Sequence, residues 1–362
     1  MSVNKKCDGL KQEMDERWID NPKEFPLSGT NYVENYNNIE DHLNQKYHVF
    51  VGLGASLAGD GVLTDHGVRH IQNVIDKSWR LIHHKIEELT GYELYILLLA
   101  IHFHDLGNIS GRNNHEQKII DVMNEVKNYL SLDVAEQDVV SYIALAHSGH
   151  VQNNEKDKNT LGALEHETTC NGIKIRPILL AAILRFADEL ADDYYRAIPN
   201  VEIPPANQIY HEYSKSLEPI GFNGKTLIFR YRIPYDFTQI TFMKEGTDVF
   251  LYDEILVRIM KCLRELDYCS RYAKGYIDIE TISVDIQVRD KENINKLLLK
   301  DSFQLSLAGY PREEAFRLDD FIITKDASDQ TSKIPKYSNG EELKIEARKL
   351  KMEARKPGEE KI

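Results

Sequence analysis

Apolar residues recur every three or four positions from residue 64 onward, and this helical period restricts the fold more than any other feature. Thr64 or Asp65 is the predicted N-cap of the first such helix. A second segment, residues 92–105, is apolar on every side until it nears Gly107, which predicts a helix in the centre of the domain. The recurring positions of the first helix are Val68, Ile71, Ile75, Trp79, Ile82 and Ile86.

The pattern changes after residue 198. Further helices are predicted at about residues 114–130, 134–148 and 176–196, with no alternating strand pattern among them. Three prolines within residues 199–207 then forbid a continuous helix. Residues 225–233 and 276–288 alternate with period two, whereas residues 249–272 have a helical pattern. The predicted fold class is therefore mainly α, an all-helical domain followed by a smaller α+β unit.

These patterns predict four parts of the 362-residue chain, a length that suits two domains. They are an N-terminal helical extension at 1–50, the helical domain at 51–198, the α+β domain at 207–325 and a charged tail at 326–362. The tail mixes Glu, Lys and Arg and is predicted to be either a solvated helix or disordered.

Composition excludes several classes of protein. Residues 1–18 are polar, so we expect no secretory signal, and no apolar run reaches the roughly 18 residues that a membrane span needs. Cys7, Cys170, Cys262 and Cys269 lack paired spacing, which is typical of reduced thiols in a cytoplasmic protein. The net charge of -13 argues against strong non-specific binding to nucleic acids. No P-loop motif occurs.

Imidazoles and carboxylates lie on three of the predicted helices. His66 and His70 are four residues apart and share a helix face, and the central apolar helix ends in His104 and Asp105. Asp188 follows a long apolar run, where a carboxylate requires a cationic partner. The sequence therefore predicts a divalent metal site formed by imidazoles and carboxylates from these helices. We expect Mn²⁺, and this ligand set also suits Fe²⁺, Co²⁺, Ni²⁺ or Zn²⁺, with Mg²⁺ less favoured.

The order His70, His104-Asp105, Asp188 resembles the H...HD...D pattern of the HD phosphohydrolase superfamily over residues 62–196. The surrounding runs HFHDLGN, GRNNHEQ and LRFADELADDYYR are similar to the SAM-and-HD-domain dNTP triphosphohydrolases and to the bacterial HD-CE class. The resemblance implies that His70, His104, Asp105 and Asp188 hold the metal of a metal-dependent phosphohydrolase. It also implies that the enzyme acts on a nucleotide, with dNTP triphosphate release as the first expectation. It also suggests bacterial defence or signalling, and we expect a homo-oligomer.

The resemblance also implies roles for individual residues. It places Asp105, His115 and Glu116 in catalysis, with His115 and Glu116 managing proton transfer. At one point the chain departs from the triphosphohydrolases, which carry an arginine just ahead of the first metal histidine, where this sequence has His66 and Gly67. The residues expected to contact the substrate are His66, Arg112, Lys118, Tyr195 and Arg196.

Two other functions remain open. His115, His147 and His150 could build a second metal position, as in HD phosphodiesterases with more histidine ligands, and two metals favour cleavage of a cyclic or linear phosphodiester. The alternative from another class is a nucleotide-binding regulatory module with little turnover. An HD nuclease acting on single strands is disfavoured by the acidic charge.

Overall fold

The structure is a computed structural model. It describes residues 9–27, 29–51, 64–107, 115–126, 132–148, 159–199, 202–273, 275–293, 295–306 and 336–353. The chain divides into two compact units, one made of Met1–Ala191 with Glu265–Asp278 and the other of Asp192–Arg264 with Ile279–Ile362. The domain limits expected from the sequence stay a prediction.

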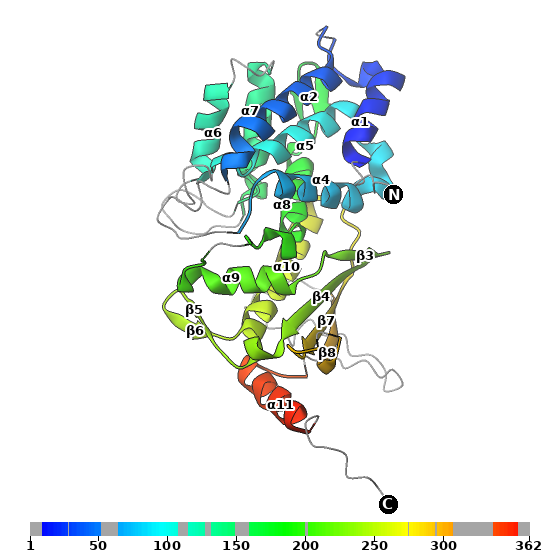
Figure 1. Ribbon diagram of the computed structural model, residues 1–362. Helices are drawn as coiled ribbons and strands as arrows, with labels where there is room; N and C mark the ends of the chain where they lie inside the picture. The colour runs from blue at the N-terminus through cyan, green and yellow to red at the C-terminus, as the bar shows by residue number, and fades with distance from the viewer. Residues whose placement is uncertain are drawn as a thin grey trace, which may run out of the picture. The chain divides into compact units, whose positions relative to one another are not determined.

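The first unit is built around one buried helix (Figure 1). Its helices are α1 (Gly9–Asp20), α2 (Tyr32–Leu43), α4 (Val68–Ile82), α5 (Gly91–Phe103), α6 (His115–Val126), α7 (Val134–Leu145) and α8 (Pro177–Leu190), with short helical turns η1 (Pro22–Glu24), η2 (Asn44–His48), η3 (His83–Glu88) and η5 (Leu161–Ala163). Every residue of α5 is buried, and α1, α2, α4, α7 and α8 all contact it. The central position predicted for this apolar segment is confirmed, because a helix that is apolar all round must be covered on every side.

The predicted cap of α4 is wrong. The N-cap residue is Gly67, and no side chain caps the helix. Asp65 instead accepts a hydrogen bond from the amide of Gly67 through its Oδ1 atom, at 2.8 Å. Its side chain therefore closes a local turn ahead of the helix. Short acidic side chains often form such local hydrogen bonds instead of capping a helix.

The expectation that no strand lies within the helical part is also wrong. A hairpin joins β1 (Thr168–Cys170) to β2 (Ile173–Ile175) in antiparallel pairing. Its turn residues Asn171 and Gly172 both have positive φ, 50° and 82°, as a tight two-residue hairpin turn requires. Strands of three residues are too short for their alternation to stand out in the sequence.

The second unit is the α+β part, and its strands confirm the predicted period-two segments. It contains η6 (Tyr194–Arg196), α9 (Pro205–Ser216), η7 (Tyr235–Thr238), the hairpin β5 (Phe242–Lys244) and β6 (Thr247–Val249), and α11 (Gly340–Glu353). Its sheet has the order β3 (Gly221–Asn223), β4 (Thr226–Pro234), β7 (Thr281–Arg289) and β8 (Leu297–Ser306). The pair β4 and β7 is parallel and the other pairs are antiparallel. A parallel pair needs a crossover, and α10 (Leu251–Ala273) lies between these strands in the chain.

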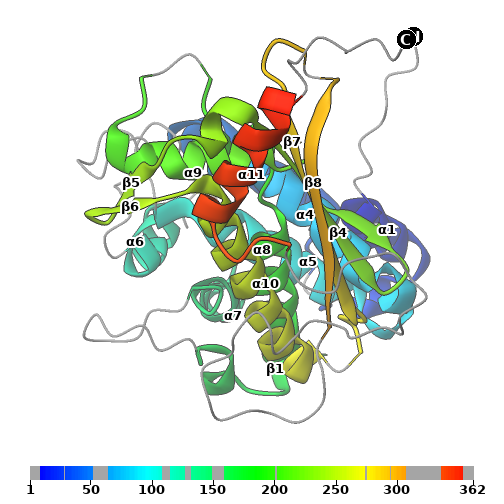
Figure 2. The same ribbon diagram turned by 90° about the horizontal axis from the view of Figure 1, so that it is seen from below.

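Residues 336–353, within the predicted tail, are docked on the second unit. The helix α11 contacts β8 and η7 (Figure 2). Its first amide, on Gly340, donates to Oδ1 of Asp253 at 2.8 Å, and Leu343 and Ala347 are buried. This described part of the tail is therefore neither disordered nor fully solvated.

Within the described part of the chain, no helix is both long and apolar enough to cross a membrane. Cys170, Cys262 and Cys269 are buried free thiols, as the sequence predicted.

Candidate metal centre

Three helices of the first unit bring the predicted ligands together. His70 lies one turn into α4, His104 and Asp105 follow the last residue of α5, and Asp188 lies near the end of α8. The start of α5 is fixed by a capping box between Thr90 and Glu93, which satisfies amides that would otherwise lack partners. The fixed start of α5 thus helps to set the position of His104 and Asp105 at its other end.

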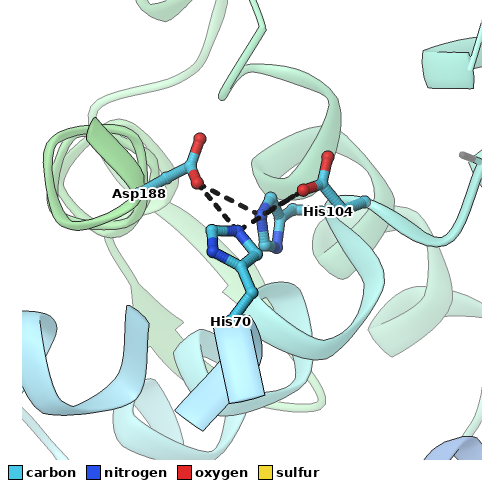
Figure 3. Close-up of side chains that lie close together, drawn as sticks. His70, His104 and Asp188 are labelled. Carbon is cyan, nitrogen blue, oxygen red and sulfur yellow. Dashed lines mark ion pairs between the residues drawn. The ribbon is translucent and has the colours of Figure 1, made fainter. Parts of the chain in front are cut away.

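The four side chains converge on one point. One ligand atom from each of His70, His104, Asp105 and Asp188 lies within 4.8 Å of all the others. Nε2 of His70 is 3.1 Å from Oδ1 of Asp188 and 3.5 Å from Oδ2 of Asp105. Nε2 of His104 is 3.3 Å from Oδ2 of Asp105 and 3.6 Å from Oδ1 of Asp188. Figure 3 shows the carboxylate of Asp188 facing the rings of His70 and His104 from a different helix.

The orientation of the imidazoles fits a metal. Nδ1 of His104 donates to the carbonyl oxygen of Ile101 at 2.7 Å, so Nε2, which faces the carboxylates, is the nitrogen that can bind a metal once its proton is displaced. Nε2 of His104 and of His70 are buried and make no hydrogen bond within the described residues. Buried polar atoms are normally satisfied, so two such nitrogens beside two carboxylates fit a site that binds a divalent cation.

The electrostatics of the cluster agree with this. Burial opposes a charge on His104, yet the carboxylates of Asp105 and Asp188 outweigh it and hold the pKa of His104 well above its usual value. Burial also opposes charge on Asp105, but His104 and His66 hold its pKa well below the usual range. His104 and His70 likewise lower the pKa of Asp188 against the effect of burial. Both carboxylates are therefore ionised at neutral pH and available to a cation.

The model of the HD-CE family matches residues 61–233. The matched segment, just under half of the chain, is similar to the HD-CE domain. No curated protein and no solved structure matches the chain. All four converging residues fall inside the matched segment, and together the match and the cluster indicate an HD-type metal-dependent hydrolase. The resemblance to the HD-CE class is thus confirmed.

Two further histidines of the HD-CE domain lie against Asp105. Nδ1 of His66 is 2.7 Å from Oδ2, and Nε2 of His147 is 3.7 Å from Oδ1. His147 donates through Nδ1 to the carbonyl oxygen of Ala144, which directs Nε2 towards the cluster. The rings of His104 and His147 are 4.9 Å apart. The two oxygens of Asp105 therefore face different imidazoles.

The remaining predicted site residues are not tested by this geometry. Tyr195 and Arg196 belong to η6 of the second unit, where the side chain of Asp193 accepts from the amide of Tyr195. The side-chain roles predicted for His115, Glu116, Lys118, Arg112 and His150 concern atoms outside what the structure describes, although α6 begins at His115.

A buried chain of polar rings near the cluster was missed in the sequence. Nδ1 of His102 is 3.3 Å from Nε2 of His48, and Nε2 of His102 is 3.0 Å from the hydroxyl of Tyr36. Burial, Lys11 and His104 lower the pKa of His102 to about 3, and burial with His102 also lowers the pKa of His48. Both rings are therefore neutral, and their contacts connect η2 and α2 to α5 two residues before His104. The extra histidine in HFHD was the available signal, but nothing in the sequence pairs it with His48.

Proposed function

We propose that the HD-CE domain is a divalent-metal-dependent phosphohydrolase that acts on a nucleotide, with release of triphosphate from a dNTP as the first candidate reaction. The observation that carries this proposal is the convergence of two imidazole nitrogens and two carboxylates within 4.8 Å. Mn²⁺ is our first choice of metal, and the mixed nitrogen and oxygen ligand set also suits Fe²⁺, Co²⁺, Ni²⁺ or Zn²⁺.

The four converging residues would hold the ion. When bound, a divalent cation supplies Lewis acidity towards phosphoryl oxygens and lowers the pKa of water. The side chains of His70 and His104 are fully buried and that of Asp105 is 7% exposed, whereas that of Asp188 is 27% exposed. Substrate therefore approaches from the side of Asp188.

Other residues complete the proposed reaction. For release of triphosphate, water attacks the α-phosphorus and the bond from that phosphorus to the 5′ oxygen breaks. His115, oriented by Glu116, gives a proton to this departing oxygen of the nucleoside. The cationic side chains Arg112, Lys118 and Arg196, together with Tyr195, hold the remaining phosphates. We place the protein in the cytoplasm, where unpaired cysteines such as Cys170, Cys262 and Cys269 stay reduced. We expect it to act as a homo-oligomer in bacterial defence or nucleotide signalling.

The test is turnover of a nucleotide panel by the full chain reloaded with Mn²⁺. dNTPs and cyclic nucleotides are incubated with the protein, and products are separated by chromatography. His104→Ala removes one converging nitrogen and should abolish turnover while the circular dichroism spectrum is retained. The control His83→Ala changes an exposed histidine and should keep full activity. The proposal is wrong if no panel member is cleaved or if His104→Ala turns over at the original rate.

A second candidate, a two-metal phosphodiesterase, is favoured by the placement of His147. Its Nε2 faces Oδ1 of Asp105, the oxygen turned away from the closest contacts of His70 and His104. A carboxylate can bridge two cations through its two oxygens, and paired cations suit diester cleavage. Elemental analysis should then give two metals per chain, falling to one in His147→Asn. One metal in both proteins favours triphosphate release.

The third candidate, a regulatory module, makes the opposite prediction about products. It binds a nucleotide tightly and releases it unchanged. Calorimetry and chromatography on one sample separate this outcome from catalysis.

A further inference from the structure

His66 lies immediately ahead of α4, four residues before His70, in a turn whose backbone is tightly held. Oδ1 of Asp65 accepts from the amide of Gly67, and a Cβ atom added to Gly67 would lie 3.0 Å from the carbonyl oxygen of His48. A larger residue at position 67 would therefore be in tight contact with the backbone of η2, which would have to give way slightly. The turn therefore fixes the backbone position from which the side chain of His66 extends.

The side chain of His66 reaches back to the metal cluster. Its Nδ1 atom is 2.7 Å from Oδ2 of Asp105, and His66 is 8% exposed. A carboxylate only accepts hydrogen bonds, so Nδ1 carries the proton and donates. The accepting oxygen is the same one that lies 3.3 Å from Nε2 of His104 and 3.5 Å from Nε2 of His70.

This contact makes the two oxygens of Asp105 unequal. A carboxylate can rotate about the bond that carries it, and metal-binding carboxylates are commonly held in place by a further hydrogen bond. Here the bond from His66 fixes Oδ2 towards the nitrogens of His70 and His104. Oδ1 is then left facing His147.

We propose that His66 is a positioning residue of the metal centre, which orients Asp105 through the bond from Nδ1 to Oδ2 and thereby raises metal affinity. This inference rests on the proposed metal-dependent function. It differs from the substrate contact expected for His66 from the sequence. Loss of a positioning residue weakens metal binding and is corrected by excess metal, whereas loss of a substrate contact raises KM even when the metal is saturating.

Three substitutions of His66 separate these roles. His66→Asn keeps an N–H donor the same number of bonds from the backbone as Nδ1. His66→Gln keeps the amide but moves it one bond further, and His66→Leu removes the donor. The matched control is His83→Leu, at an exposed histidine of the same unit.

The measurements use Co²⁺ as the probe with the full chain. Its Kd is obtained by competition with a chromophoric chelator, and its visible absorption reports ligand geometry. We expect His66→Leu and His66→Gln to weaken Co²⁺ binding about 10- to 100-fold and to alter the spectrum. His66→Asn and His83→Leu should stay close to the original protein. With a substrate found in the panel above, activity of His66→Gln should recover at saturating metal without a rise in KM.

Each other outcome overturns the inference. Unchanged Kd and spectra in His66→Leu and His66→Gln would show that the contact does not position Asp105. Equal loss in all three variants, His66→Asn included, would show that the donated hydrogen bond is not the cause. A raised KM at saturating metal would return His66 to substrate binding. If the unmodified chain binds no Co²⁺, the proposed metal-dependent function is wrong. That result comes from the unmodified protein alone, so it is distinct from any result on the His66 variants. The comparison of His66→Asn with His66→Gln remains decisive if His66→Leu does not fold.

Discussion

Nδ1 of His104 donates to the carbonyl oxygen of Ile101, one turn earlier in the same helix, at a distance of 2.7 Å. This bond selects the tautomer of His104 and turns Nε2 towards Asp105 and Asp188. A local backbone contact therefore orients the ring for a cation.

Metal affinity should rise with pH through the neutral range. The pKa of His104 is raised in the metal-free protein, because two carboxylates outweigh the effect of burial. Below that pKa the ring is protonated, and a metal must displace the proton, so affinity falls by about tenfold for each pH unit of further acidification. Above it the affinity is constant. Titration with Mn²⁺ between pH 6 and about pH 9 measures this, and a flat profile over the whole range would contradict the raised pKa.

Metal binding should stabilise the chain, and Asp188→Asn should remove that effect. A ligand that binds only the folded state stabilises it by about 2.7 kcal/mol at 100 times Kd, and the asparagine oxygen carries no charge to attract the cation. Scanning calorimetry with Mn²⁺ and with a chelator gives the difference in Tm. Asp138→Asn, an exposed carboxylate on α7, should retain the full metal-dependent shift.

Breaking the buried ion pair of Arg185 and Glu265 should destabilise the first unit. Arg185 donates through Nε and Nη2 to the two carboxylate oxygens at 2.7 and 2.9 Å, and both residues are buried. Arg185→Met leaves Glu265 buried without its partner, at a cost of about 3–5 kcal/mol. In the exposed pair of Arg80 with Asp76, Arg80→Met should cost less than about 1 kcal/mol. Urea unfolding compares the two, and equal losses would count against this account.

Gly340→Ala should loosen α11 from the second unit. A Cβ atom at position 340 would lie 2.2 Å from Cβ of Phe250, so the helix has to move, at a cost of about 1–3 kcal/mol. Alanine has a higher helix propensity than glycine, so propensity alone would stabilise α11, whereas the clash would destabilise its docking. The direction of the change in stability therefore shows which effect is larger. Limited proteolysis should cut the tail faster in this variant and at the original rate in Glu341→Ala. Slower cleavage of Gly340→Ala would mean that propensity outweighs the steric clash.

The sequence by itself determined which residue types could bind a metal and the helices that carry them. Helical period placed the candidate imidazoles and carboxylates on helices, the apolar run marked Asp188 as needing a partner, and the resemblance to the HD pattern selected His70, His104, Asp105 and Asp188. The apolar segment became α5 and the alternating segments became β4 and β7 for the same reason, since periodicity reports burial along a single element.

Only the tertiary structure decided which partners those residues meet. The bond from His66 to Asp105 joins positions 39 residues apart, and the contact of His48 with His102 joins positions 54 apart. Likewise, the docking of α11 depends on the fit of Gly340 against Phe250. Periodicity carries no information about such pairs, because they are set by how finished helices pack, and packing is chosen by shape and volume across the whole core.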